Sequence, residues 1–534
     1  MAHDLFEAIE FLKREGDALL KRFIRAHRGV MRADLRFEVV YSQSSAADNG
    51  EPRDSAESEN AFLGVSVWAG APRGTRRGGA QSPCVAAGQG GYEIGGLARD
   101  RRKLVAAIDT ALLAACDRAA ASAREQAALL KHLGRDSLGP AEWGVAAVPP
   151  IRDEVAAIYR RDPRALDPEE LKRLCRDASA AVKGLGREIA FNRIAATSEL
   201  RHEVFISSEG TQIAQAFAFS QGDCYVVAQG DRGGHHENYD TIGQQRGIEC
   251  LTEGYRGELM PNPDLQTFAI ELAKEARELA AAPVLNPRDR EVTVVTDPHF
   301  NALVAHEIVG HPCEADLALK MEAAYAGRSW FLRSIHDSEV GKRVASPLLS
   351  ACSDPGADGY GHYRYDHEGT PGRRVMHFER GVFRGFLNSR ATAAALGVEP
   401  NGSARATDAR HVPLIRMSNT FFMPGERAPE EIIGEVDRGY YVCGSRIPSI
   451  AESRENFRIS ARRIYEIKRG QLGRLFRSGS VMSDSKRFFM QVDAVGNDLR
   501  LIAIPNCGKG QPMQVKRMSN GGPTIRSLAG LAGG

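Results

Sequence analysis

The sequence has no large excess of charge of either sign. Its 70 Lys and Arg residues almost balance its 68 Asp and Glu residues, which leaves a formal net charge of +2. A balanced chain supplies no net field that would attract a polyanion or an anionic lipid surface. We therefore expect neither a nucleic-acid partner nor a membrane partner.

The sequence also lacks the marks of an exported, membrane-spanning or disulfide-stabilised protein. No apolar run is long enough to cross a bilayer, and the segment beginning at Met1 is polar and amphipathic where a secretory signal has an apolar core. The nine cysteines are scattered without CxxC pairs, which argues against a disulfide framework and against a zinc ribbon. These absences together predict a cytoplasmic protein.

The length and the order of predicted elements indicate an α+β fold. With 534 residues and 43% hydrophobic content, the chain can form two or three domains with a sizeable core. We expect an N-terminal α+β domain over residues 1–135 and a middle α+β domain over 150–285 that contains an antiparallel meander. A β-rich C-terminal domain should follow over 286–534.

The N-terminal region combines two clear helix patterns with polar stretches. Apolar residues at helical intervals predict helices over 4–28 and 100–133, and alternation predicts a strand over 63–68. The stretch 43–60 is rich in Ser, Asn and Glu and has no core-forming residues, so we expect a surface loop there. The Gly- and Arg-rich passage from 71 to 91 predicts a second solvated loop.

The middle region has helix patterns at both ends and strand patterns between them. Helices are predicted over 167–184 and 266–282. Four short strands, at 188–197, 202–208, 212–220 and 224–228, are predicted to form the meander. The vicinal pair His235 and His236 then lies in a glycine-flanked loop, where we expect exposed side chains.

The most informative segment is His306-Glu307-Ile308-Val309-Gly310-His311. A strand predicted at 292–295 precedes it, and Asp297 and Pro298 are the expected cap and first residue of a helix. On an undistorted helix, residues at i and i+5 lie about 140° apart, so both histidines reach one metal ion only across a wide turn, a break or a helix end. Gly310 and Pro312 weaken the helix at that place.

The chemistry of such a site requires a third ligand. A zinc ion that activates water needs three protein ligands and one open position, and His306 and His311 can supply two. The spacing leaves four candidates for the third: Cys313, Glu314, Asp316 and the distant Cys507 in a glycine-rich loop. Glu314 and Asp316 could instead hydrogen-bond to the imidazoles.

Glu307 follows the first histidine and could serve as a general base. It would take a proton from metal-bound water and return it to a leaving amine. The simpler interpretation is an ordinary helix whose histidines hydrogen-bond locally and whose glutamate is solvated.

Several segments resemble the TldD/PmbA family, and specifically its HExxxH-containing, TldD-like zinc metallopeptidase branch. Residues 306–316, HEIVGHPCEAD, are similar to that family's motif with its trailing acidic residues. The stretch 507–511 (CGKGQ) and the glycine-rich end of the chain resemble its carboxy-terminal signature. Segments at 366–371, 416–420 and 438–442 stand in the family's order, and the resemblance extends from about residue 187 to the end.

This resemblance implies a Zn²⁺ ion held by His306, His311 and Cys507, with Glu307 as catalytic base. It further implies hydrolysis of short, unfolded or precursor peptides inside a dimer cavity. The dimer partner would be a second copy of the chain or a motif-less TldE/PmbA-like subunit. Three departures concern the site: the loop after Lys509 is one residue shorter than in many relatives, Pro312 stands where relatives often have a small residue, and His367 replaces a common acidic residue and becomes a rival ligand.

Two other functions stay open on the sequence alone. The chain could be a non-proteolytic peptide-binding or regulatory subunit with a structural metal, or a metal-assisted tailoring hydrolase acting on a modified small substrate. Arg416 and Asn419 could line a cleft, although a structural role is expected for both.

Overall fold

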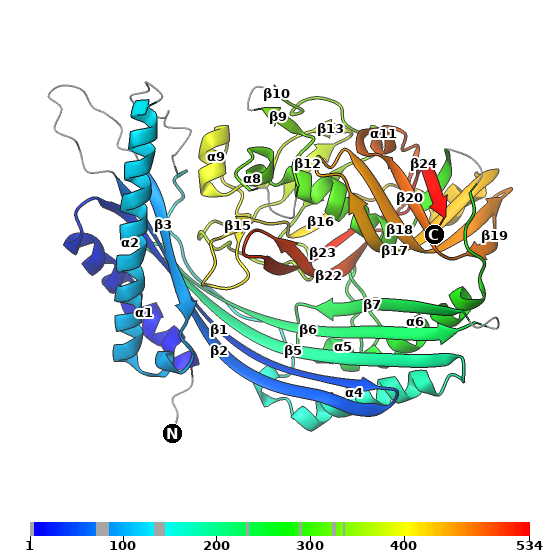
Figure 1. Ribbon diagram of the computed structural model, residues 1–534, viewed down its shortest axis with the longest axis horizontal. Helices are drawn as coiled ribbons and strands as arrows, with labels where there is room; N and C mark the ends of the chain where they lie inside the picture. Colours follow the sequence, from blue (N-terminus) through cyan, green and yellow to red (C-terminus); the bar gives the residue numbers. More distant parts are fainter. Residues whose placement is uncertain are drawn as a thin grey trace.

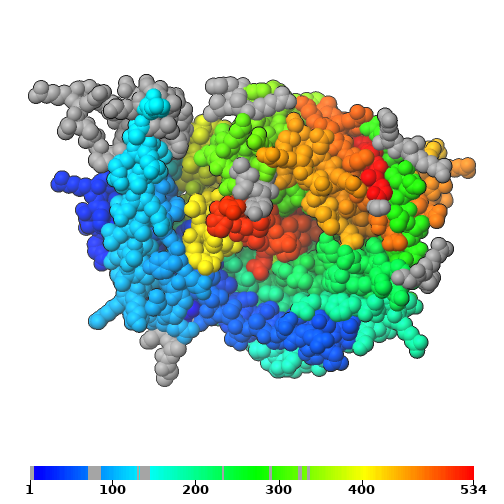
Figure 2. Space-filling view, viewed as in Figure 1, coloured from blue at the N-terminus to red at the C-terminus, as the bar shows by residue number. Residues whose placement is uncertain are grey.

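The computed structural model describes residues 5–70, 85–132, 145–230, 234–287, 291–322, 327–334 and 337–533. A long, curved sheet carries helices along its outer side, and a second body formed by the C-terminal half of the chain sits on its inner side (Figure 1). The space-filling view shows the two bodies packed against each other (Figure 2). The mixture of helices and strands, with a β-rich C-terminal region, confirms the predicted α+β fold class. Among the described helices, none is long and apolar enough to span a membrane.

The curved sheet has seven strands in the order β3-β2-β1-β5-β6, with both β4 and β7 paired to β6. Its bounds are β1 (Val30–Asp48), β2 (Glu51–Gly70), β3 (Val85–Glu93), β4 (Arg152–Val155), β5 (Ile189–Ser207), β6 (Gln212–Gln229) and β7 (His235–Gln244). Strands from the first two predicted regions, 1–135 and 150–285, therefore belong to one sheet.

The prediction of a surface loop over residues 43–60 is wrong. These residues belong to the β1–β2 hairpin, which turns at Asn49 and Gly50, both with positive φ. Polar composition does not prevent pairing here, because β1 forms ladders with β2 on one side and with β5 on the other. Gln43 is buried and donates to the Leu166 carbonyl at 3.0 Å.

Three further predictions in this sheet need correction. The four short strands of the predicted meander are two long antiparallel strands, β5 and β6. The predicted loop at 71–91 forms part of β3 from residue 85 onward, and residues 71–84 lie outside the described part of the chain. His235 and His236 begin β7 instead of lying in a loop; His235 is exposed as expected, but His236 is buried.

The four predicted long helices are confirmed and cover the outer side of the curved sheet (Figure 1). They are α1 (Phe6–Ala26), α2 (Arg101–His132), α4 (Pro168–Lys183) and α6 (Leu265–Ala281), with residue 133 outside the described residues. α1 and α2 share one apolar cluster with β1 and β2. α4 and α6 share a second cluster with β5 and β6.

The C-terminal body contains two larger sheets and a large apolar core that they share. One sheet has the order β17-β8-β24-β20-β18-β19, with β21 beside β24, and the other has the order β13-β12-β11-β16-β23-β22. The core joins both sheets and the motif helix, as Val294, Ile308 and Met518 illustrate. The predicted helical pieces near 391–396 and 428–434 are confirmed as α9 and α10.

The strands of this body are β8 (Val292–Thr296), β9 (Leu332–Ser334), β10 (Asp337–Ser338), β11 (Ala351–Ser353), β12 (Val375–Glu379), β13 (Val382–Phe383), β14 (Ala404–Arg405), β15 (Leu414–Ile415), β16 (Asn419–Phe422), β17 (Arg438–Ile450), β18 (Asn456–Lys468), β19 (Gln471–Phe476), β20 (Gly479–Asp484), β21 (Ala494–Val495), β22 (Arg500–Lys509), β23 (Gln514–Gly522) and β24 (Ile525–Gly533). Its helices are α7 (Pro298–Val304), α8 (Ala315–Ala318), α9 (Arg390–Leu396), α10 (Pro429–Gly434) and α11 (Ser485–Met490), and α5 (Glu249–Thr252) precedes it.

Candidate metal centre

The motif helix changes its winding between the two histidines. It begins after β8, where the Asp297 carboxylate caps α7 by accepting from the Phe300 amide at 2.7 Å. From Ala305 to Gly310 the helix is a π-helix, and the His311 amide bonds to the His306 carbonyl five residues back. Such an i to i+5 turn brings the two histidines onto one side. The wide turn required by their spacing is confirmed.

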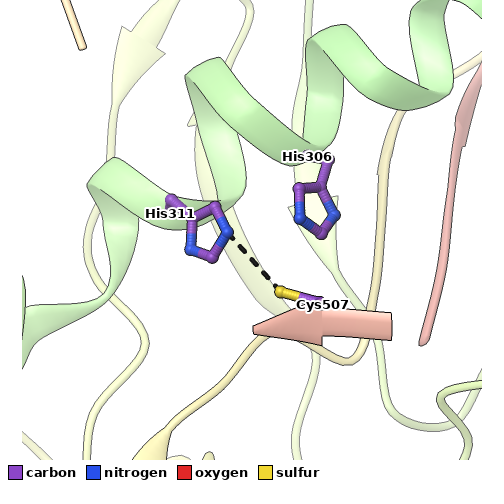
Figure 3. Close-up of side chains that lie close together, drawn as sticks. All are labelled: His306, His311 and Cys507. Carbon is purple, nitrogen blue, oxygen red and sulfur yellow. Dashed lines mark hydrogen bonds between the residues drawn. The ribbon is translucent and has the colours of Figure 1, made fainter. Parts of the chain in front are cut away.

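The two histidines meet a cysteine from a distant strand. Both imidazoles extend from the same helix toward Cys507 on β22 (Figure 3). The candidate ligand atoms of His306, His311 and Cys507 all lie within 4.8 Å of one another, and all three residues are buried. The Cys507 Sγ is 3.5 Å from the His311 Nε2.

Hydrogen bonds orient both imidazoles. The His306 Nδ1 donates to the Asn520 Oδ1 at 2.8 Å, and the His311 Nδ1 donates to the Glu314 Oε2 at 3.1 Å. Because each Nδ1 donates to one of these partners, each Nε2 is the nitrogen that can bind a metal ion once it has lost its own proton. Partners of this kind fix the tautomer and orientation of metal-binding histidines.

The Glu314 carboxylate, which contacts His311, also contacts a buried lysine. Lys509, itself fully buried, donates to the Glu314 Oε2 at 3.0 Å, to the Asp316 Oδ1 at 2.7 Å and to the Ile415 carbonyl at 2.9 Å. Burial alone would raise the pKa of Glu314, but Lys509 and His311 hold that pKa well below its usual range. Burial raises the pKa of Asp316, despite Lys509, and the neighbouring Glu314 charge adds to the rise.

The three candidate ligands also influence one another's ionisation. Burial alone would raise the pKa of the Cys507 thiol, but His306, Arg416 and His311 hold it well below its ordinary value. Burial would lower the pKa of His306, but the adjacent thiolate raises it to about 9. Metal binding must therefore displace protons from the imidazoles while keeping the thiolate.

This donor set fits a zinc ion. Zinc accepts imidazole nitrogen at about 2.0–2.1 Å and thiolate sulfur at about 2.3 Å, so neighbouring ligand atoms of a tetrahedral site lie about 3.5 Å apart. The Cys507–His311 separation already matches, and the widest separation closes with movements of about 1 Å. Three ligands leave a fourth position, as in catalytic zinc sites.

Glu307 lies beside this group and pairs with an arginine. The Arg454 Nη1 donates to the Glu307 Oε2 and, at 3.1 Å, to the Glu307 carbonyl. Burial would raise the pKa of Glu307, but His306, Arg454 and His311 lower it. The carboxylate is thus ionised and held on the cavity side of the helix, where Glu307 and Arg454 are both wall residues.

The other candidates from the sequence lie elsewhere. Cys313 is buried in the apolar core of the C-terminal body. His367 pairs with Glu203 through a 3.2 Å contact and is not part of the three-residue group. Arg416 donates to the Gln514 and Cys507 carbonyls, and the Asn419 amide bonds to two backbone carbonyls, so both have structural contacts.

Sequence reasoning did not identify Asn520, Lys509 and Arg454 as neighbours of the site. Lys509 belongs to the 507–511 signature, which is the one signal that could have drawn attention to it. Asn520 and Arg454 reach the site through strand pairing and a hairpin, which no local pattern reveals.

A cavity of about 1060 Å³ opens beside this centre. Glu199, Arg201 and Glu203 of β5 and Phe217 and Phe219 of β6 contribute one part of its wall. The motif helix and the β22–β23 hairpin contribute another part. The cavity therefore lies between the inner side of the curved sheet and the C-terminal body.

Comparisons with known proteins agree with this arrangement. The family model described as "PmbA/TldA metallopeptidase central domain" matches residues 161–282, and "PmbA/TldA metallopeptidase C-terminal domain" matches residues 289–528. A Methanothermobacter thermautotrophicus protein named "Metalloprotease" is 30% identical over 387 residues, covering 72% of this chain and 78% of that protein.

A Saccharolobus solfataricus protein named "Zinc metalloprotease TldD homolog" is 29% identical over 246 residues, covering 45% of this chain and 51% of that protein. Among solved structures, TldE from Thermococcus kodakarensis superimposes with a TM-score of 0.67 at 16% identity, covering 98% of this chain and 100% of that one. At that identity the likeness establishes a shared fold.

Proposed function

Because the chain belongs to the PmbA/TldD metallopeptidase family, we propose that it is a zinc-dependent peptidase with His306, His311 and Cys507 as metal ligands and Glu307 as catalytic base. The observation that carries this proposal is the meeting of two oriented imidazoles and a low-pKa thiolate at the wall of a large cavity, with an ionised glutamate beside them.

The proposed chemistry divides between the ion and the protein. A zinc ion, when bound, supplies Lewis acidity that polarises a carbonyl and activates water. Glu307 then accepts a proton from the attacking water and returns it to the leaving amine. Asn520 and Glu314 hold the imidazoles in the tautomer that presents Nε2. Arg454 fixes the position of the Glu307 carboxylate.

The proposed substrates are short, unfolded or precursor peptides. The candidate centre is buried between a sheet and a second body, so a scissile amide must enter the cavity to reach it. A flexible chain can do so, whereas an amide within a folded domain cannot leave its own hydrogen-bonded structure without unfolding. The cavity volume lies at the upper end of the range for ligand pockets, which suits an extended peptide segment.

We further propose that the chain works as a dimer, with a second copy or with a TldE/PmbA-like subunit without the histidine motif. The shared fold with TldE supports this, because two chains of one fold can form equivalent or nearly equivalent contacts. Purification of the chain alone and together with such a subunit, followed by mass measurement in solution, distinguishes the two arrangements.

The test of the peptidase proposal is the Glu307→Gln variant. Wild type and variant are loaded with zinc, their metal content is measured, and both are incubated with a pool of unfolded peptides. Glu307→Gln should retain the metal and lose cleavage by at least about 100-fold, the scale of a general base. The matched control is Glu258→Gln, which alters an exposed glutamate outside the cavity wall and should cleave like wild type.

Full activity in metal-loaded Glu307→Gln would refute the proposed role of this residue. Absence of cleavage by the zinc-loaded wild type, alone and with a TldE-like partner, would instead favour a peptide-binding subunit with a structural metal. Cleavage restricted to small modified amides would favour a tailoring hydrolase.

A further inference from the structure

Two cationic side chains in the cavity wall have no anionic partner among the described residues. They are Arg405, on β14, and Lys516, on β23. Most other charged groups of this wall are paired, so these two stand out as positions where a ligand would supply the missing charge.

Arg405 is 6% exposed, yet no carboxylate in the described structure forms an ion pair with it. Its guanidinium donates to the Met417 carbonyl and lies over the Tyr363 ring, 4.7 Å from the ring centroid, which is within the range of a cation–π contact. Its buried Nε has no hydrogen-bond partner within the described residues. A nearly buried guanidinium with an unused donor is costly unless something else satisfies it.

Lys516 is half-buried, and its Nζ has neither a hydrogen bond nor an ion pair with any residue that the structure describes; burial lowers its pKa to about 7. Its place in the sheet is informative, because Lys516 is the direct antiparallel partner of Cys507 across the β22–β23 hairpin. Directly opposed residues have Cβ atoms about 4.5–5.5 Å apart on the same face of a sheet. The Cβ of Lys516 therefore lies beside that of Cys507, the candidate sulfur ligand.

The nearest carboxylates already have other hydrogen-bond or ion-pair partners. Glu203 contacts the His367 imidazole at 3.2 Å, where burial lowers the His367 pKa to about 4 and keeps the ring neutral, and Glu38 pairs with Arg201 at 2.7 Å. Glu199 pairs with Arg517 at 3.0 Å. Neutralisation of Arg405 and Lys516 by these groups would break existing pairs.

We propose that Arg405 and Lys516 form a carboxylate-binding subsite next to the metal centre, which holds the carboxylate of a peptide substrate within one or two residues of the scissile amide. The proposal rests on the proposed peptidase function. The carboxylate can come from the peptide's own C-terminus or from an Asp or Glu side chain, since the subsite recognises the same group in both. A guanidinium binds a carboxylate through its planar N–H donors, and an ammonium adds a point charge.

The subsite predicts a specificity that a metal centre alone does not give. A carboxylate bound by two cations in a poorly solvated wall should gain about tenfold or more in affinity over the matching amide, as charge-assisted hydrogen bonds do. Peptides whose C-terminal carboxylate, or whose Asp or Glu side chain, lies near the scissile bond should therefore be preferred.

The test compares peptides that differ only in this charge. One acetylated heptapeptide is made as the C-terminal acid and as the C-terminal amide, and the amide is also made with Glu or Gln at each position. Dissociation constants are measured on zinc-loaded Glu307→Gln, and kcat/KM is measured on zinc-loaded wild type. We expect at least about a tenfold preference for one carboxylate-bearing peptide, and that preference should shrink toward unity in Lys516→Met and Arg405→Gln.

The matched control is Arg446→Met, which removes one positive charge from another strand of the same cavity and should keep the wild-type preference. Lys516→Arg should also keep it. A preference for the acid over the amide identifies the terminal carboxylate, and a preference for Glu over Gln identifies a side chain.

Equal dissociation constants of all charged and neutral peptides for zinc-loaded Glu307→Gln would overturn the subsite, whatever the subsite variants do. A preference unchanged in Lys516→Met and Arg405→Gln would overturn the assignment to these residues. The binding arm separates this proposal from the peptidase: a carboxylate preference without cleavage refutes the peptidase alone, and cleavage without preference refutes the subsite alone.

Discussion

Replacement of Lys509 by methionine should damage the protein far more than replacement of an exposed lysine in a similar ion-pair group. The Lys509 ammonium is fully buried and bridges Glu314, Asp316 and the Ile415 carbonyl. Lys509→Met keeps an unbranched side chain of similar length in the core but leaves two buried carboxylates without their shared cation. The variant therefore tests whether this buried bridge supports the candidate metal centre.

The expected cost follows from the burial. Removal of one partner from a buried ion pair costs about 3–5 kcal/mol, because the remaining charge stays desolvated. At about 2.1 cal/mol/K of unfolding entropy per residue, 534 residues correspond to a lowering of the melting temperature by about 2.5–4.5 °C. Metal affinity should also fall by about tenfold, since Glu314 then holds the His311 imidazole less firmly.

The assay is thermal unfolding of the metal-loaded proteins together with a zinc competition titration. The matched control is Lys342→Met, because Lys342 also pairs with two carboxylates, Asp337 at 3.6 Å and Glu339 at 3.3 Å, but is 53% exposed. An exposed pair contributes about 0–1 kcal/mol, so this control should melt within about 1 °C of wild type.

A double variant isolates the bridge itself. Lys509→Met combined with Asp316→Asn should be less destabilised than the sum of the single variants, by about 1–3 kcal/mol, because the second change removes one of the two carboxylates left without a cation. A Lys509→Met protein that melts like Lys342→Met and binds zinc like wild type would refute the reasoning.

Three further outcomes are expected. Gly310→Ala should lower the stability by about 1–3 kcal/mol and weaken metal binding, because an added Cβ would lie 1.8 Å from the buried Met417 Sδ. Gly434→Ala is the control, because an added Cβ there meets open space. Equal melting temperatures of the two variants would contradict the expected overpacking at Gly310. At a thousandfold excess of zinc over its dissociation constant, metal binding stabilises the folded protein by about 4 kcal/mol, so chelation should lower the melting temperature of wild type by up to about 4 °C. Chelation should change the melting temperature of Cys507→Ala much less. Equal shifts in both proteins would count against Cys507 as a ligand. Burial would raise the pKa of Glu199, but Arg517 and Arg201 lower it to about 2. The ionised Glu199 therefore contributes about 3 kcal/mol to the free energy of unfolding above pH ~4.5, and this contribution is lost as the pH falls toward 2. Urea titrations across that window should show a smaller loss of stability for Glu199→Gln than for wild type, and parallel stability curves for the two proteins would contradict the assignment.

The sequence predicted the long helices well because their apolar spacing is local and complete. Leu104, Ile108 and Leu112, which defined the pattern in α2, are all fully buried. The wide turn in the motif helix was also predictable, because two histidines five residues apart cannot share one side of an ordinary α-helix. In both cases the residues that determine the local structure lie within a few helical turns of one another in the sequence.

The errors arose where burial depends on distant strands. Residues 43–60 look like a loop by composition, yet residues 43–48 pair with β5 on one side and with β2 on the other, and Ala47 shares an apolar cluster with α4. The β5 and β6 strands continue through residues that resemble breaks, such as 198–201, because each side has a partner ladder.

The site was partly predictable for the same reason. Spacing alone left Cys313, Glu314, Asp316 and Cys507 as open candidates for the third ligand, and only the family resemblance singled out Cys507. The structure brings Cys507 to the histidines through a strand that begins almost 200 residues downstream. Asn520 and Arg454 depend on the same tertiary placement and have no sequence signal of their own.

The central claim is that His306, His311 and Cys507 hold a zinc ion with one position left open for chemistry. X-ray absorption at the zinc edge of the metal-loaded protein tests it most directly. The account predicts one sulfur at about 2.3 Å, two imidazole nitrogens at about 2.0–2.1 Å and one light-atom ligand from solvent. A spectrum without sulfur, or with four protein ligands that close the site, would contradict it.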